Sequence, residues 1–500
     1  MSLEHNVGSA LLQAARRYGN KPAIMLHAGP LSYASFGQLV HGLTGLLRNK
    51  GVGRGSCVAI QLDDPSGVLV CIAAASLLGA AWTDGKPGSL HVIAENVTHT
   101  LVSQRPPADV PTAGTVVVVN PTAIAAANRG GGLPLGTTDG FANASDMSRM
   151  GISSGSTGDR KAIWITAESE WKRIQWRWEA AKDLAAPTCW CMFPPKSGMG
   201  SNTRIQTLLD GGLLIETITN DLFRRGKVDM VVGSPAQLAT FMRSLDQRGI
   251  NTTLPLVMVG GSRPGTEFLR NLRKRFKKVA IFYGSTEMGN IAEYAQATRS
   301  NYDGRLKVSK DMHIEVVDDD GAPVPAGEIG HLRMKSDLGL PHYFDEETNA
   351  RAIRDGWYYS GDTGRFSSDG YLFIEGRSDD TVNIGGTKVN ILTYDDFVTS
   401  FDGVEDGYAF LKPDDLGVDR INLMVRFKAG VDPHAQATRL MESMVAAREI
   451  RVPPGMIYAS KEVPRTDTGK PVRREALQLS ETLEPVLVTE KSSSAKAHQG

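Results

Sequence analysis

Short apolar segments alternate with amphipathic helical patterns along roughly the first 280 residues of the chain. Apolar residues recur at helical spacing over residues 7–18, 35–50, 168–181, 235–245 and 267–276. Continuous apolar segments predict strands at residues 56–60, 115–119, 230–232, 256–259 and 279–283. Continuous apolar strands between helices are typical of a sheet that is covered on both faces. We therefore expect an α/β fold.

The pattern changes after residue 306, where short strands near 314–317, 332–334 and 371–373 are separated by Asp/Gly turns. We interpret this region as a β subdomain. From residue 379 a shorter α+β pattern predicts strands near 407–411 and 423–427 and a helix over 433–450. Because 500 residues exceed one hydrophobic core, we expect an N-terminal domain of residues 1–378 and a small α+β domain of residues 379–482. Residues 483–500 are predicted to be a disordered tail.

Charge and cysteine content exclude several classes of protein. The 55 basic and 55 acidic side chains cancel, so nucleic acid is not the expected partner. The four cysteines form no CxxC pair, and Cys189 and Cys191 fit alternate positions of a strand better than a metal site. The longest apolar run, residues 68–82, is too short to span a bilayer and predicts a buried helix. Free thiols and the lack of a signal-like N-terminus favour a cytoplasmic protein without a membrane span.

A run of small polar residues is the first segment that suggests chemistry. It reads ISSGSTGDRK and contains Ser153, Ser154, Gly155, Ser156, Thr157, Gly158 and Lys161. Small residues let backbone N–H groups converge on an anion, and the lysine adds a point charge. The run has neither the Walker order nor the GxGxxG order, and a flexible surface loop is the alternative.

The order Ser-Ser-Gly-Ser-Thr-Gly-x-x-Lys resembles the pyrophosphate-binding loop of the adenylate-forming superfamily. That superfamily contains acyl-CoA synthetases, peptide-synthetase adenylation domains and firefly luciferase. Further segments follow in the family's order, namely VGGS at 259–262, YGSTE at 283–287, WYYSGD at 357–362, GRSDD at 376–380 and PRTDTGK at 464–470. The resemblance covers roughly residues 30–480 and is strongest to acyl-CoA synthetases.

The resemblance implies a role for each matching residue at the nucleotide. Tyr283, followed by Gly284, would stack on adenine, while Gly261 and Ser262 would form the turn that passes the adenine and the acyl pocket. Thr286 would contact the α-phosphate and Glu287 would hold Mg²⁺, because Mg²⁺ bridging phosphates prefers carboxylate oxygen. Asp362 and Arg377 would bind the ribose.

The last two implied roles concern the C-terminal domain. Lys470 would be the catalytic lysine, because a mobile ammonium can neutralise charge as a carboxylate attacks the α-phosphorus of ATP. Asp379 falls where the family has its hinge residue, so the C-terminal domain is expected to be mobile.

The chain departs from the family pattern at two charged positions. Arg160 stands where a proline is usual, and we expect it to face solvent rather than to add charge at the pyrophosphate. Lys196 stands where many acyl-CoA synthetases have a histidine before the acyl pocket. It could pair with a second anionic group on the substrate, but a long lysine that points to solvent is the favoured interpretation.

We expect an AMP-forming acid–thiol ligase that uses ATP and Mg²⁺ to make an acyl-AMP and then a thioester with CoA. Loading of a carrier-protein phosphopantetheine is the alternative, and residues 385–388 would lie beside the pantetheine in either case. A nucleotide-binding relative without catalysis is the third alternative, which the joint presence of Glu287, Asp362, Arg377 and Lys470 disfavours. The segment 191–200 lacks the aspartate of amino-acid-activating relatives, which favours a small acid without an α-amine.

Overall fold

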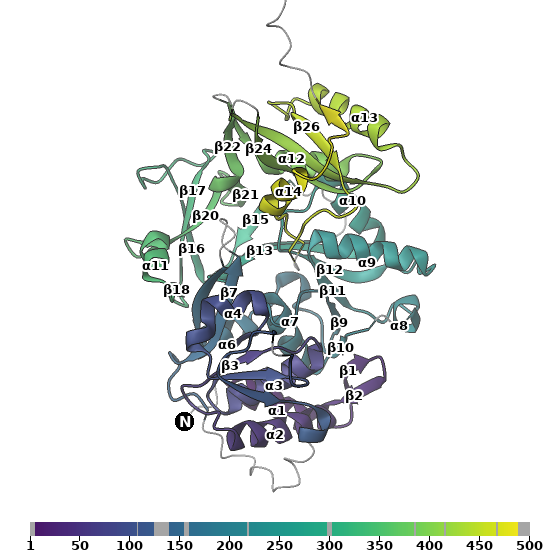
Figure 1. Cartoon of the computed structure of the whole chain (residues 1–500). Coiled ribbons are helices and arrows are strands. Elements are labelled where there is room, and N and C mark those ends of the chain that lie inside the picture. The colour runs from purple at the N-terminus through teal and green to yellow at the C-terminus, as the bar shows by residue number, and fades with distance from the viewer. Residues whose placement is uncertain are drawn as a thin grey trace, which may run out of the picture.

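The computed structural model describes residues 6–107, 109–124, 140–154, 160–217, 220–297, 303–384, 387–414, 417–466 and 469–488. Figure 1 shows a large N-terminal part, coloured purple to green, and a smaller C-terminal part above it, coloured light green to yellow. None of the described helices is long and apolar enough to cross a membrane.

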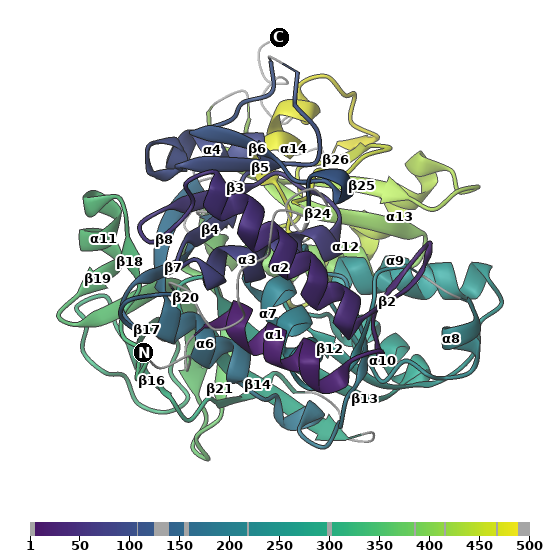
Figure 2. The same ribbon diagram turned by 90° about the horizontal axis from the view of Figure 1, so that it is seen from below.

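Three N-terminal helices pack against one another, and Figure 2 shows two of them, α1 and α2, side by side across one face. They are α1 (Val7–Tyr18), α2 (Tyr33–Asn49) and α3 (Pro65–Leu77). Each is preceded by a residue whose side chain accepts a backbone N–H of the first turn: Asn6, Ser32 and Asp64. The buried helix predicted over the apolar run 68–82 is shorter than that run, because α3 ends at Leu77 and a strand begins at Ala81.

A seven-stranded sheet carries the start of the predicted phosphate loop. Its strands, in spatial order, are β18 (His342–Tyr343), β8 (Arg160–Thr166), β7 (Met147–Ser154), β4 (Ala81–Asp84), β3 (Cys57–Ile60), β5 (His99–Val102) and β6 (Thr115–Val118). The strands from β7 to β6 pair in parallel, whereas β7 and β8 form an antiparallel pair. Helix α4 (Pro87–Ile93) and the 3₁₀ turn η2 (Ala94–Asn96) connect β4 to β5.

The larger sheet has 14 strands and joins the α/β region to the predicted β subdomain. Its parallel part contains β12 (Leu254–Val259), β11 (Met230–Gly233), β9 (Thr188–Cys191), β10 (Leu213–Ile215) and β1 (Pro22–Leu26), with β2 (Gly29–Ser32) at the edge. Next to β12 come β13 (Phe276–Ser285), β14 (Gly289–Ala297), β15 (Arg305–Val308), β21 (Leu372–Arg377), β20 (Trp357–Phe366), β17 (Gly330–Ser336), β16 (Met312–Val317) and, beside β20, β19 (Ile353–Arg354). The α/β fold expected from the sequence is confirmed.

Two of the helices that connect these strands end earlier than the periodicity predicts. The connecting helices are α6 (Ala167–Gln175), α7 (Gly198–Leu209), α8 (Asn220–Arg224), α9 (Pro235–Gln247), α10 (Thr266–Arg275) and α11 (Glu346–Ala352), with η3 (Glu179–Ala181) after α6. The helix predicted over 168–181 ends at Gln175, because Trp176 is extended and the next tryptophan, Trp178, packs on Phe282. Phe276, the predicted end of another helix, instead begins β13.

The C-terminal elements have a hydrophobic core of their own. After η4 (Ser378–Asp380), β22 (Thr381–Ile384) pairs with β23 (Thr387–Asn390), and a four-stranded sheet follows, made of β24 (Val404–Pro413), β25 (Asp419–Phe427), β26 (Met456–Ala459) and β27 (Leu487–Val488). Its helices are α12 (Ile391–Ser400), α13 (Pro433–Ala446) and α14 (Arg473–Ser480), so the helix predicted over 433–450 ends early. The predicted tail also starts too early, because β27 pairs with β26; residues 489–500 lie outside the described part.

Candidate active site

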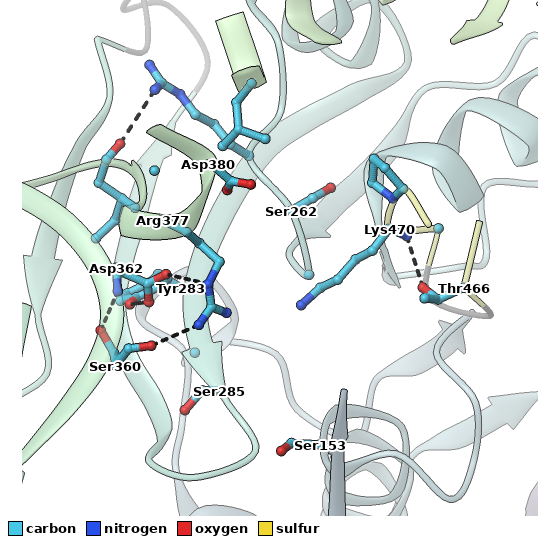
Figure 3. Close-up of a pocket in the computed structure, with 18 of the residues that line it drawn as sticks. Ser153, Ser262, Tyr283, Ser285, Ser360, Asp362, Arg377, Asp380, Thr466 and Lys470 are labelled. Carbon is cyan, nitrogen blue, oxygen red and sulfur yellow. Dashed lines mark hydrogen bonds and ion pairs between the residues drawn. The ribbon is translucent and has the colours of Figure 1, made fainter. Parts of the chain in front are cut away.

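A cleft of about 2840 Å³ is lined by residues of both the N-terminal and the C-terminal elements. Figure 3 shows that Tyr283, Asp362 and Arg377 lie together on one side of it and that Lys470 extends into it from the other side. The motif segments are far apart in the sequence, but the fold brings these four residues to one cavity.

The nucleoside side of the cleft is built where three strands meet. Tyr283 lies near the end of β13, and its hydroxyl donates a hydrogen bond to the Asp362 carboxylate on β20. Asp362 pairs in register with Arg377 on β21, whose Nε lies 3.9 Å from Asp362 Oδ1. Arg377 also donates to the Ser360 carbonyl oxygen at 3.0 Å. Burial raises the pKa of Asp362, and the Arg377 guanidinium opposes that rise.

The turn after β13 presents Thr286 and Glu287 to the cleft. Arg173 of α6 holds this turn by donating to the carbonyl oxygens of Thr286 at 2.8 Å and Glu287 at 2.6 Å. The Tyr343 hydroxyl donates to Glu287 Oε1 at 3.1 Å. Within the described ranges no three His, Cys, Asp or Glu side chains form a metal-binding group. Glu287 offers a carboxylate oxygen at the cleft, and this is a ligand type that Mg²⁺ prefers.

The predicted phosphate loop is described only at its two ends. Ser153 and the backbone of Ser154 belong to β7, and Lys161 of β8 pairs with Ser153 and lines the cleft. The predicted residues Gly155, Ser156, Thr157 and Gly158 lie outside the described part. Arg160 is exposed but also lines the cleft, and its Nη1 donates to Ser89 Oγ at 2.7 Å.

The glycine turn after β12 needs glycine for steric and conformational reasons. A Cβ on Gly260 would collide with the Phe282 ring, and Gly261 has a φ of +84°. Gly261, Ser262 and Gly284 all line the cleft.

Lys470 is positioned by a tight turn of the C-terminal domain. Lys470 N–H donates to Thr466 Oγ1 at 3.1 Å, and Thr466 N–H donates to the Lys470 carbonyl oxygen at 2.9 Å. Arg465 anchors the turn through an ion pair with Asp406 at 2.6 Å. Surrounding protein atoms and the Arg377 guanidinium lower the pKa of Lys470, although the carboxylates in the cleft oppose this. The predicted hinge residue Asp379 lies in η4, next to Asp380 in the cleft wall.

The prediction that Lys196 points to solvent is wrong. Its side chain is only 4% exposed, and Nζ lies 2.9 Å from Asp84 Oδ1 and 3.2 Å from the Ile60 carbonyl oxygen. The lysine is buried because Asp84, at the end of β4, supplies the opposite charge inside the cleft wall. Arg149 is a second buried cation of the same wall, and the motifs do not predict it. The sequence feature that could have indicated it is a charged residue inside an otherwise strand-like segment.

The fold and the cleft define an adenylate-forming enzyme. The chain belongs to the AMP-binding enzyme family, whose model matches residues 11–344. It is 23% identical over 472 residues to 2-succinylbenzoate–CoA ligase of Geobacillus sp. (strain WCH70), covering 87% of this chain and 89% of that relative. It is 25% identical over 492 residues to medium/long-chain-fatty-acid–[acyl-carrier-protein] ligase FadD10 of Mycobacterium tuberculosis (strain ATCC 25618 / H37Rv), covering 89% of each.

Solved structures confirm the fold. The anthranilate CoA ligase AuaEII in complex with anthranoyl-AMP superposes with a TM-score of 0.81 and 19% identity, covering 97% of this chain and 99% of that one. The amide bond synthetase McbA from Marinactinospora thermotolerans has a TM-score of 0.74 and 18% identity, with 95% and 99% covered.

Proposed function

We propose that this protein is an AMP-forming acid–CoA ligase, which activates a carboxylic acid with ATP and transfers the acyl group to CoA. The observation that carries this proposal is the convergence of Glu287, Asp362, Arg377 and Lys470 on one cleft. Family membership supports it, because the matched relatives include CoA ligases.

In the first half-reaction the residues of the cleft bind and orient ATP and the acid. The Tyr283 ring offers an apolar face to adenine, and Asp362 accepts hydrogen bonds from the ribose hydroxyls. Glu287 would hold Mg²⁺, which supplies charge neutralisation at the phosphates when bound. Lys470 bridges the substrate carboxylate and the α-phosphate as that carboxylate displaces pyrophosphate, so that the developing charge is neutralised in place.

In the second half-reaction the C-terminal domain rotates about Asp379 and withdraws Lys470. The CoA thiol then attacks the acyl carbonyl and AMP leaves. Strand β23 would reach the pantetheine arm in this second state. Gly385 and Gly386, which the sequence also predicts to lie beside the pantetheine, are outside the described part of the chain. Cytoplasmic ATP and CoA would supply the reaction.

A carrier-protein phosphopantetheine is the second candidate acceptor, because FadD10, a relative matched over 89% of this chain, is an acyl-carrier-protein ligase. The two acceptors share the reactive thiol end and differ in the group to which the thiol is attached.

The test is carboxylate-dependent exchange of labelled pyrophosphate into ATP across a panel of acids, followed by product analysis with CoA or with a phosphopantetheinylated carrier. We expect exchange with at least one acid and an acyl-CoA product. Exchange followed by acylation of the carrier alone would replace CoA as the acceptor. No exchange with any acid would refute the ligase function.

A further inference from the structure

Arg149 is a buried cation that has no carboxylate ion-pair partner among the described residues. It lies on β7 and is 5% exposed, yet it lines the cleft. Within the described part of the chain its guanidinium makes one hydrogen bond, from Nη2 to the Lys196 carbonyl oxygen at 3.3 Å, and its Nε has no partner. A guanidinium has five N–H donors, and a buried charge without a partner is unfavourable. The arrangement therefore favours an anion that the cleft receives from outside.

Two neighbouring strands place the groups around Arg149 on one face. Arg149 pairs in register with Trp82 of β4, and its guanidinium lies 4.7 Å from the centre of the Trp82 ring. Asp84 follows Trp82 by two residues and Gly151 follows Arg149 by two, so all four face the same side of the sheet. The Trp82 ring covers one face of the guanidinium, so the N–H groups at the edge of the guanidinium are left to donate hydrogen bonds to a ligand.

Helix α7 adds positive potential to the same place. A Cβ on Gly198, the first residue of α7, would lie 3.3 Å from Arg149 Nη1, so the helix begins beside the guanidinium. A helix N-terminus attracts anions through its unpaired N–H groups and its dipole. Lys196, two residues before α7, brings a second positive charge to this wall, where it pairs with Asp84.

None of the nearby described carboxylates forms an ion pair with Arg149. Arg149, Arg173 and Lys196 lie near three acidic side chains, Asp84, Glu170 and Glu287. Asp84 pairs with Lys196, and Glu170 accepts a hydrogen bond from the Ser148 hydroxyl rather than from Arg149. Glu287 also attracts the Arg173 guanidinium electrostatically, but the Glu287 carboxylate accepts a hydrogen bond from the Tyr343 hydroxyl on the nucleotide side.

The position of Arg149 relative to Thr286 fixes how far this anion would lie from the reaction. A Cβ on Gly151 would lie 3.0 Å from Thr286 Cγ2. Arg149 is two residues earlier on the same strand, so its Cα lies about 7 Å from the Cα of Gly151. A group bound at Arg149 is thus separated from the activated carboxylate by a short spacer.

We propose that Arg149, Lys196 and the N-terminus of α7 bind a second anionic group of the acid, so that the enzyme selects dicarboxylic acids. The spacer between the two carboxylates is a few carbons or one aromatic ring. This inference rests on the proposed ligase function and names the substrate class of the same site. One carboxylate reacts with ATP while the other pairs with Arg149.

The experiment compares each diacid with its half-methyl ester, which keeps the carbon skeleton and removes one charge. We expect the wild-type protein to prefer the diacid in pyrophosphate exchange by at least about tenfold in kcat/KM, because a site built for a charged group rejects the analogue that lacks it. Arg149→Met and Lys196→Met should each reduce that preference by about tenfold or more, and Arg149→Lys should retain part of it. Lys172→Met, which removes an exposed lysine of α6, is the matched control and should leave the preference unchanged.

Binding of the same compounds to the wild-type protein without ATP, measured by calorimetry, tests the anion site independently of turnover. Tighter binding of the diacid than of the half-ester supports the site even if no exchange is observed, which would count against the ligase function alone. Equal affinity for both compounds, or exchange with equal kcat/KM for both, would overturn the inference and leave the ligase function standing. A preference for acids that carry an amine, held by Asp84, would also overturn it.

Discussion

Gly469 gives a way to disturb the contact between the two domains without touching a side chain of the site. It precedes Lys470 and has a φ of +82°. A Cβ at this position would lie 2.8 Å from the Ala236 Cβ and 3.2 Å from Ser234 Oγ, both at the start of α9. We predict that Gly469→Ala disfavours the domain position in which Lys470 reaches the cleft.

Two energetic effects of Gly469→Ala can be separated. Left-handed backbone costs an L-residue about 1–2 kcal/mol wherever the C-terminal domain lies. The contact with Ala236 acts only when the domains meet, and overpacking of this kind costs about 1–3 kcal/mol. A change of that size shifts an equilibrium by about 5- to 150-fold. If the two domain positions are about equally populated in the wild-type protein, the rate of adenylation should therefore decrease by a factor in this range.

The assay measures the two half-reactions separately, as pyrophosphate exchange and as thioester formation from supplied acyl-AMP. We expect Gly469→Ala to reduce the first and to change the second little. Gly430→Ala is the matched control, because Gly430 has a φ of +85° with no described atom within 4 Å of an added Cβ. Ala236→Gly in the Gly469→Ala background should restore exchange. Equal loss in both half-reactions, or no restoration, would refute the steric argument.

Four further outcomes are expected. Lys470→Ala should impair adenylation much more than thioester formation from acyl-AMP, and equal loss in both would contradict its assigned role. Glu287→Gln should raise the Mg²⁺ concentration needed for half-maximal exchange by about tenfold, corresponding to a loss of about 1.4 kcal/mol, whereas an unchanged Mg²⁺ dependence would argue against a metal ligand. Glu216→Ala should lower the free energy of unfolding in urea by about 3–5 kcal/mol, because it leaves the buried Arg204 without its ion-pair partner; a loss below about 1 kcal/mol would be incompatible with this. Burial raises the pKa of Asp396 from about 3.8 to about 6, so the folded protein loses stability as the pH rises through this window; Asp396→Asn should have a higher Tm than wild type at pH 7.5, with the difference disappearing near pH 4.

The nucleotide side could be predicted from the sequence because its residues stand in short, ordered segments at strand ends. Tyr283 lies near the end of one apolar strand, and Glu287 lies in the turn that follows it. A turn that follows a strand at the sheet edge presents its residues to the cleft. Asp362 and Arg377 are 15 positions apart, but they face each other because their strands pair in register. Local motifs are therefore sufficient to predict these residues of the nucleotide side.

The acyl side could not be predicted in the same way, because it depends on pairs from distant segments. Lys196 is buried only because Asp84, more than 100 positions earlier, lies opposite it. The interpretation of Lys196 as a solvated side chain follows from the usual behaviour of a long lysine, and tertiary pairing overrides it. Arg149 is likewise explained by its pairing with Trp82, which no local pattern shows.

Two buried arginines differ in their partners: Arg204 lies within α7, and Arg149 lies beside the start of that helix. Arg204 pairs with Glu216 at 2.7 Å and donates to the carbonyl oxygens of Phe193 at 2.9 Å and Cys191 at 2.7 Å. Its guanidinium is satisfied within the fold, as buried charges in proteins usually are. Arg149 is equally buried but makes one long hydrogen bond with the described residues. Since the same fold completes the bonds of one arginine and not of the other, the unfilled donors of Arg149 are best explained by a group that arrives with the substrate.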